Sequence, residues 1–126
     1  MAQSVISYDK DLPEIPGRCA WQPPASYLVK DESAASGWRV EAAGRRPSNL
    51  LLIAKLRKGV DAWRAADYPG ASDVSRRLFQ YWFEEEHEVS GFPAPFRFYF
   101  CQREAIETLA YLTEIAKLND VRELID

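Results

Sequence analysis

The sequence is poor in the residues that build disulfide frameworks, metal sites and catalytic triads. Its 126 residues include two cysteines, Cys19 and Cys101, and a single histidine, His87. Two thiols do not make a disulfide framework, and no further nitrogen or sulfur ligands lie near His87 at a spacing that suits a metal. We therefore interpret Cys101 as a buried, inert thiol at an apolar helix start, and His87 as part of a solvated helix end.

Long apolar runs and phosphate-binding motifs are also missing. No stretch of about 18 apolar residues occurs, so no membrane-spanning segment is predicted. The N-terminal MAQSVISYDKD lacks a basic segment followed by an apolar core, which argues against a secretory signal. These absences predict a cytoplasmic protein with reduced thiols and no membrane partner. Neither GxxxxGK[ST] nor GxGxxG is present, so the chain carries no recognisable phosphate loop of its own.

The charged residues are unevenly distributed. The net charge is −3, but residues 39–77 carry nine basic and four acidic residues, which gives +5 there and −8 elsewhere. A basic segment suits contact with phosphates, although solvated helix faces produce the same pattern, and both interpretations stay open. Carboxylates at helical spacing, such as Glu104 with Glu107, are interpreted as surface acids and not as a catalytic acid–base pair.

The pattern of apolar residues predicts a mainly α fold. Residues 1–47 form an irregular, proline-rich arm, in which 26–30 and 38–42 are strand candidates for a β-hairpin. Residues 48–126 form a small helical domain of three to four helices. The predicted helices are 49–67, with Ser48 as N-cap, then 72–86, with Ser72 as N-cap, then a helix from FRFYFC to about Lys117, and a last turn in VRELI.

Each predicted helix has an apolar face that we expect to be buried. The three faces consist of Leu52, Leu56, Val60 and Trp63; of Val74, Leu78, Tyr81 and Trp82; and of Ala105, Leu109, Leu112 and Ala116. From these helices we expect one common core: Trp63, Leu78, Trp82, Ile106 and Leu109. Gly59 inside the first helix is unfavourable by about 1 kcal/mol relative to alanine, so the helix has a point there at which it can kink.

Three blocks of the sequence resemble a known family. They are GRRPS (44–48), VDAWRAADYPGASDVSRRLFQYWF (60–83) and FYFCQREAIETLAYLTEI (98–115). Together they resemble the N-terminal region of superfamily 2 DEAD/DEAH-type helicases of the type III restriction enzyme, Res-subunit-like kind. The resemblance implies an accessory region that leads into an ATPase core and acts on duplex DNA in defence. Its phosphate loop, Walker B acids and second helicase lobe do not occur before Asp126, so no ATPase activity is expected of this chain alone.

The resemblance also implies a set of binding residues. Gln102 matches the glutamine of the helicase Q-motif, which hydrogen-bonds the adenine of ATP, with Mg²⁺ and ATP bound only by the complete protein. A side-chain amide offers one donor side and one acceptor, which match the N6 amine and N7 of adenine. Tyr99 and Phe100, beside Phe98, would supply a ring against the base. The basic pairs Arg45–Arg46 and Arg76–Arg77 are the candidates for contact with DNA.

Two other interpretations remain open from the residues themselves. The chain is also typical of a stand-alone helical module that binds a partner protein through aromatic-rich helices. It also fits a small DNA-binding domain that uses the basic segment 39–77. Under either of these, Gln102 is an ordinary polar residue at the N-terminus of a packed helix.

Overall fold

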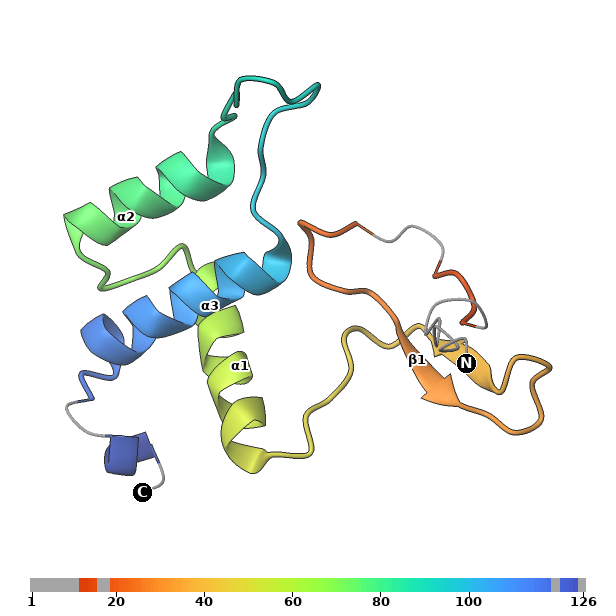
Figure 1. The fold of residues 1–126 in the computed structure, drawn as a ribbon. Helices are drawn as coiled ribbons and strands as arrows, with labels where there is room; N and C mark the ends of the chain where they lie inside the picture. The colour runs from red at the N-terminus through yellow and green to blue at the C-terminus, as the bar shows by residue number, and fades with distance from the viewer. Residues whose placement is uncertain (1–11, 16–18, 119–120, 125–126) are drawn as a thin grey trace, which may run out of the picture. The chain divides into compact units, whose positions relative to one another are not determined.

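The chain forms two compact units, Met1–Arg46 and Pro47–Asp126. The computed structural model describes residues 12–15, 19–118 and 121–124. The first unit contains a hairpin and the second contains the helices (Figure 1). Among the described residues, the helical elements are much longer in total than the two strands of four residues each. The expected mainly α fold therefore describes the second unit, whereas the whole chain combines helices, one hairpin and long irregular segments.

The predicted hairpin is confirmed. Strand β1 (Tyr27–Lys30) pairs antiparallel with β2 (Trp38–Glu41), and Tyr27 lies opposite Glu41. The loop is fixed by Asp31, whose Oδ1 accepts hydrogen bonds from the Ser33 backbone N–H at 3.0 Å and from its hydroxyl at 2.5 Å. These bonds favour the ionised carboxylate and lower the pKa of Asp31.

Helix α1 (Leu51–Ala65) has the predicted buried face, but not the predicted cap. Val60 and Trp63 are buried, and the two leucines of the same face are half-buried. The expected capping role of Ser48 is wrong, because the N-cap position is Leu50. The Ser48 hydroxyl accepts a hydrogen bond from the Leu50 N–H at 3.1 Å instead, so it fixes the turn that precedes the helix.

The end of α1 is an unusual turn with two consecutive left-handed residues. Asp67 and Tyr68 have φ values of 62° and 54°. The Tyr68 N–H bonds to the Trp63 carbonyl at 2.9 Å and the Asp67 N–H to the Arg64 carbonyl at 3.0 Å, which is the Schellman pattern of a helix C-terminus. A left-handed conformation is costly for a bulky residue, so the turn is held by what Tyr68 contacts.

The remaining helices follow the predicted boundaries closely. Helix α2 (Asp73–Phe79) is capped by Ser72, whose hydroxyl accepts from the Ser75 N–H at 3.1 Å, as predicted. It continues into the π-helical turn η1 (Gln80–Glu84). Helix α3 (Phe100–Ala110) continues into the π-helical turn η2 (Tyr111–Ile115), and a 3₁₀ turn, η3, covers Val121–Leu124.

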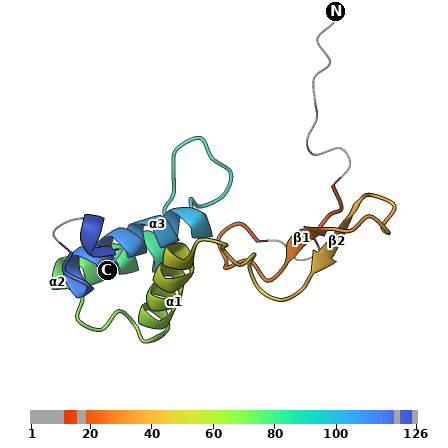
Figure 2. The same ribbon diagram turned by 90° about the horizontal axis from the view of Figure 1, so that it is seen from below.

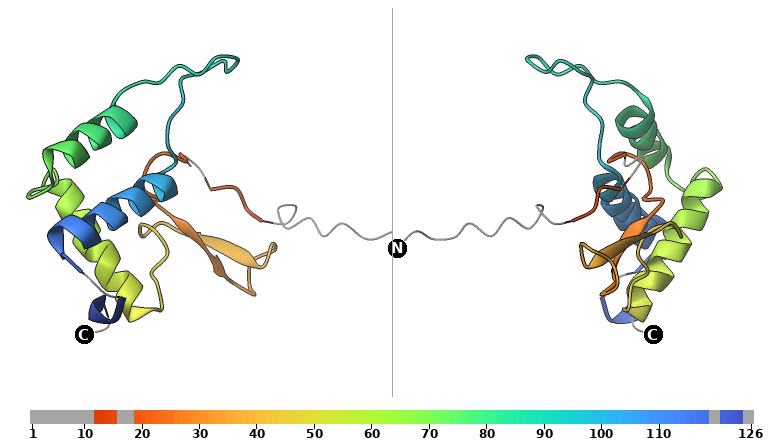
Figure 3. Two further views of the ribbon diagram at one scale, coloured as in Figure 1. Left: turned by 60° about the vertical axis from the view of Figure 1, so that its left-hand side comes forward. Right: turned by 90° about the vertical axis from the view of Figure 1, so that its right-hand side faces the viewer.

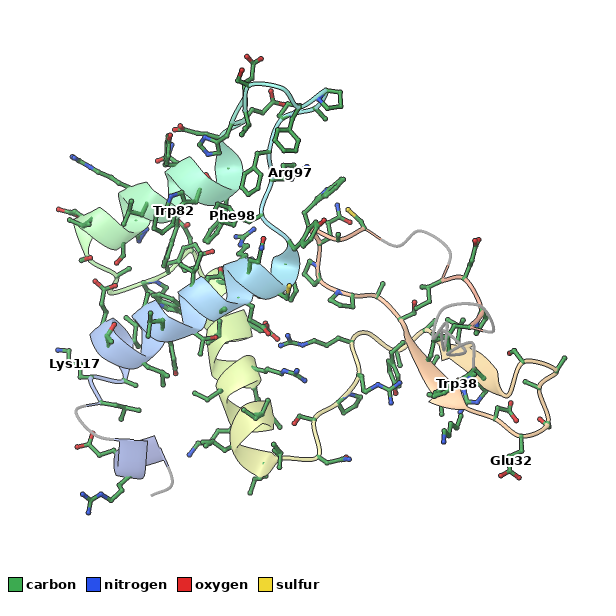
Figure 4. All side chains as sticks on the ribbon, viewed as in Figure 1. Glu32, Trp38, Trp82, Arg97, Phe98 and Lys117 are labelled. Atoms are coloured by element: carbon green, nitrogen blue, oxygen red, sulfur yellow. The ribbon has the colours of Figure 1, made fainter. Side chains whose placement is uncertain are left out.

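In the helical unit, α3 crosses α1 and a long loop connects η1 to α3 (Figure 1). Helix α3 passes across α1 in Figure 1, and the same crossing is visible from other directions in Figure 3. The segment between η1 and α3 is a long loop that extends away from the helices (Figure 2). Trp82 of η1 and Phe98 at the end of this loop have ring centroids 6.5 Å apart, and Figure 4 labels both.

The core of the second unit is aromatic. Trp63, Tyr68 and Phe79 are buried against one another, with ring centroids between 4.7 and 6.0 Å apart. Six partly buried residues pack around them: Ala71, Phe83, Ile106, Ala110, Tyr111 and Ile115. The Trp63 indole N–H donates to the Pro69 carbonyl at 2.9 Å, so its one polar atom is satisfied inside the core.

Gly59 lies within α1, where a side chain would be too close to the core. A Cβ placed there would lie 2.9 Å from the Tyr111 hydroxyl and 3.2 Å from its Cζ. Helix α1 runs through this position to Ala65. Glycine therefore permits close approach of Tyr111 to the helix, which offsets the helix propensity that glycine lacks.

The predicted apolar faces of α2 and α3 are wrong in part. Leu78 is 37% exposed and Leu109 is 67% exposed, and four other residues of the two expected faces are exposed: Val74, Tyr81, Ala105 and Ala116. In α2 the aromatic core takes Phe79 in place of Leu78. In α3 the buried residues are Phe100 and Glu107, and Ile106, which we expected in the core, is half-buried against it. The inward face therefore combines a charge with apolar residues, whereas Ala105 and Leu109 of the predicted stripe face away from it.

This arrangement predicts losses of stability of very different size for two truncations. Phe79→Ala removes a ring from the centre of the aromatic core, so we expect it to reduce the free energy of unfolding by about 3–5 kcal/mol. Leu109→Ala removes an exposed side chain, and its cost should stay below about 0.5 kcal/mol. Denaturant unfolding of both variants, analysed with the same dependence of the unfolding free energy on denaturant concentration, measures the difference in their stability. Equal costs would mean that Leu109 belongs to the core and the inward face of α3 is misassigned.

Candidate functional site

The carboxylate of Glu107 is the most deeply buried charged group among the described residues. Its side chain is 0% exposed, although it sits in the middle of α3. Arginine and tyrosine side chains from three segments of the chain converge on its two oxygens. A buried carboxylate without partners would be strongly unfavourable, so these contacts decide whether α3 can pack with this face inward.

Arg64 of α1 supplies the principal contact. Its Nε donates to both Glu107 oxygens, at 2.9 and 3.0 Å, and its Nη2 donates to Oε1 at 2.7 Å. Its Nη1 donates to Asp61 at 2.8 Å. Burial disfavours the charged guanidinium, but the hydrogen bonds to Glu107 and then to Asp61 outweigh it, and the pKa of Arg64 is raised. The planar fork of arginine suits this bidentate arrangement.

Tyr68 and Arg103 complete the cluster. The Tyr68 hydroxyl donates to Glu107 Oε2, and the Arg103 Nη2 donates to the Tyr68 oxygen at 2.9 Å. Arg103 Nε also contacts Oε2 at 3.4 Å, and its guanidinium lies 5.0 Å from the centre of the Phe83 ring. Burial, and then the hydrogen bond to Glu107, raise the pKa of Tyr68 to about 12. We call Glu107, Arg64, Tyr68 and Arg103 the Glu107 cluster.

The expectation that Glu107 is a surface acid is therefore wrong. Its neighbour Glu104 has a side chain 18% exposed and lies 4.0 Å from Arg64, at the rim of the same cluster. The sequence carried one signal of this arrangement, since Glu107 lies seven residues after Phe100 and four before Tyr111, on the aromatic side of the helix. The prediction missed this acid because it considered only apolar residues as candidates for burial. The arginine that pairs with Glu107 also lies 43 residues away in the sequence.

Gln102 lies at the exposed N-terminus of α3. Its side-chain Oε1 accepts a hydrogen bond from the Tyr99 backbone N–H at 3.0 Å, as an N3 residue does in a capping arrangement. This bond assigns the orientation of the amide, because only the oxygen can accept. The oxygen keeps a second lone pair, and within the described part of the chain its Nε2 has no hydrogen-bond partner.

The three aromatic residues before Gln102 are adjacent in the sequence but differ in exposure. Tyr99 is 53% exposed and lies beside Gln102 at the helix start. Phe100 is 6% exposed, and the Arg64 guanidinium lies 5.1 Å from its ring centre. Phe98 packs near the rings of Phe83 and Phe96, at 5.9 and 5.1 Å. Tyr99 is therefore the ring that is open to a ligand, and Phe100 is part of the packed interior.

The four candidate DNA-contacting arginines fall in different units. Arg45 and Arg46 end the first unit, whereas Arg76 and Arg77 lie on α2 of the second. Arg46 donates to the Leu28 carbonyl and lies 5.3 Å from the Tyr27 ring centre, so it braces the hairpin. Arg76 donates to the Asp67 carbonyl at 3.1 Å and lies 3.7 Å from its carboxylate. Arg45 also has an intramolecular contact, so three of the four are already engaged within the chain.

The structure departs from the expectations for Cys101 and for His87. Cys101 is exposed on α3, so its assignment as a buried thiol is wrong, because the inward face of the helix is taken by Phe100 and the Glu107 cluster. His87 lies in the loop after η1, is half-buried, and bonds through Nε2 to the Tyr81 carbonyl.

The described residues contain no group of three or more potential metal ligands. They also contain no helix long and apolar enough to cross a membrane.

Comparison with protein-family models, with curated proteins and with solved structures gives no match.

The raised pKa of Tyr68 predicts a pH-dependent contribution to stability. The phenol loses its proton near pH 10 when unfolded and near 12 when folded, so its contribution is complete below pH 10 and is lost as pH rises from 10 to 12. We expect the difference in unfolding free energy between the wild type and Tyr68→Phe to fall by about 2–3 kcal/mol over that interval. Denaturant unfolding at several pH values measures it.

Tyr81→Phe is the matched control for removal of a phenol, since Tyr81 is 53% exposed. A difference between the wild type and Tyr68→Phe that stays constant from pH 9 to 12 would show that the Tyr68 proton is not held by Glu107.

Proposed function

We propose that this chain is the N-terminal accessory region, with a Q-motif-like segment, of an ATP-dependent DNA helicase or translocase of the type III restriction, Res-like kind. In this proposal it is inactive as an ATPase on its own. An ATPase core, in cis or in trans, supplies the phosphate-binding and Mg²⁺-binding groups. The complete protein acts on duplex DNA.

The position of the resembling blocks supports this proposal. Block 60–83 covers the second half of α1, the left-handed turn, α2 and most of η1, and block 98–115 covers α3 and η2. All six buried side chains of the described residues fall within these two blocks: Val60, Trp63, Tyr68, Phe79, Phe100 and Glu107. The resemblance therefore coincides with the residues that determine the packing of the second unit.

The exposure and hydrogen bonding of the Gln102 amide are the observation that supports nucleotide binding. The amide is exposed, its oxygen is oriented by Tyr99 N–H, and one acceptor lone pair and the Nε2 donor are unused within the described residues. Adenine presents an N6 donor beside an N7 acceptor, which this pair of groups matches. Tyr99 supplies an exposed ring next to the amide, and stacking of a base on such a ring is favourable.

A second candidate, a helical module that binds a partner protein, is supported by a different observation. The exposed face of α3 contains Leu109, 67% exposed, together with Cys101 and Ala105. Exposed apolar stripes on helices often mark protein contacts. This candidate is compatible with the first where the partner protein is the ATPase core. The two differ in what they predict for Gln102, which affects nucleotide binding only under the first.

The adenine contact predicts a base-selective loss of affinity. In the complete protein, Gln102→Ala should weaken ATP binding by about 1–3 kcal/mol, because two hydrogen bonds to the base are lost. GTP binding should change less, since guanine presents an acceptor where adenine presents its amine. Binding titrations with both nucleotides and Mg²⁺ measure the difference.

The matched control is Gln80→Ala, a change of the same residue type at an exposed position of η1, which should leave both affinities unchanged. Equal losses for ATP and GTP, or no loss for either, would mean that Gln102 only caps α3. The second candidate function would then be favoured.

A further inference from the structure

The start of α3 is held from the side opposite to Gln102. Gln102 and Tyr99 are exposed, whereas Phe100, on the other side of the same turn, is buried, and Glu107 follows on that buried side. We infer that Arg64 of α1, acting through Glu107 and Phe100, is a positioning residue that sets the Gln102 amide for recognition of a nucleotide base. This inference rests on the function proposed above and deepens it.

Arg64 contacts α3 at two points that bracket Gln102 in the sequence. Its guanidinium lies 5.1 Å from the Phe100 ring centre, two residues before Gln102. The same group donates three hydrogen bonds to Glu107, five residues after it. A helix that is contacted at two points about two turns apart has little freedom to rotate or slide against α1, so the direction of the intervening side chain is fixed.

Tyr68 and Arg103 strengthen the same hold. Arg103 directly follows Gln102, and its Nη2 donates to the Tyr68 hydroxyl at 2.9 Å. Tyr68 is itself fixed by the left-handed turn at the end of α1 and by its hydrogen bond to Glu107. These contacts, together with those of Arg64, tie the first two turns of α3 to α1 and its C-terminal turn.

The chemistry of base recognition explains why this hold matters. Two parallel hydrogen bonds to a base edge need the amide plane in register with the base, and sites of this kind are placed by supporting side chains to within about 0.5 Å. Arg64 does not contact the base in this account. Its fork of N–H donors cannot be reproduced by lysine, which keeps the charge but offers a single flexible ammonium.

Arg64→Lys in the complete protein therefore tests the inference. We expect the preference for ATP over GTP to fall roughly tenfold. A displacement of a functional group by about 1 Å can reduce its effect by about a hundredfold, so a tenfold loss corresponds to a smaller displacement of the amide. In the Gln102→Ala background the same substitution should leave the preference unchanged, because the amide that it positions is gone. Arg57→Lys, an identical substitution two turns earlier on α1, is the control and should leave the preference at the wild-type value.

A structural role alone would lower stability, or weaken ATP and GTP equally, without changing the preference. An unchanged preference in folded Arg64→Lys, while Gln102→Ala still lowers it, would overturn the inference and leave the proposed function standing. An unchanged preference in Gln102→Ala would overturn both. Where Arg64→Lys fails to fold, Phe100→Leu makes the same test, since it removes the ring that the Arg64 guanidinium contacts and keeps an apolar side chain.

Discussion

The second unit depends on the satisfaction of one buried carboxylate. Glu107 is fully buried in the middle of α3, and burial of a charge is unfavourable unless it is paired and hydrogen-bonded. Arg64 approaches from α1 and Tyr68 from the turn after it, so these elements pack in the register that brings their donors to the carboxylate. A buried ion pair adds little net stability compared with well-packed apolar residues, but removal of one partner is strongly destabilising. The cluster therefore specifies one arrangement of the two helices.

The same constraint explains the distribution of exposed residues on α3. With Glu107 inward, the opposite face carries Gln102 near its start and Leu109 further along, and both are exposed. The packed face holds the helix, which leaves the outer face available for contact with a nucleotide or with a partner protein. The left-handed turn at Asp67 and Tyr68 belongs to this arrangement, because it delivers the Tyr68 hydroxyl to the carboxylate at the cost of an unfavourable backbone conformation.

Local signals in the sequence predicted the elements well. The hairpin and the three helices follow from strand-like segments, proline–glycine breaks and the Ser72 cap. The inward faces of α2 and α3 were not predicted, because their selection depends on contacts distant in the sequence. Phe79 replaces Leu78 in a core made of rings, and Glu107 is buried by an arginine 43 residues away. The position of Gln102 at the N-terminus of α3 was predicted from the third block, whereas its hydrogen bond to Tyr99 follows only from the backbone of the helix start.

The stability of Glu107→Gln tests the account most directly. Glutamine keeps the shape of the side chain but removes the charge that Arg64 and Arg103 share, so we expect the free energy of unfolding to fall by about 3–5 kcal/mol. Glu104→Gln, on the same helix at the rim of the cluster, should cost less than about 1 kcal/mol. Denaturant unfolding of both variants at neutral pH gives the comparison. A cost for Glu107→Gln no larger than that for Glu104→Gln would contradict the claim that the buried carboxylate holds α3 against α1.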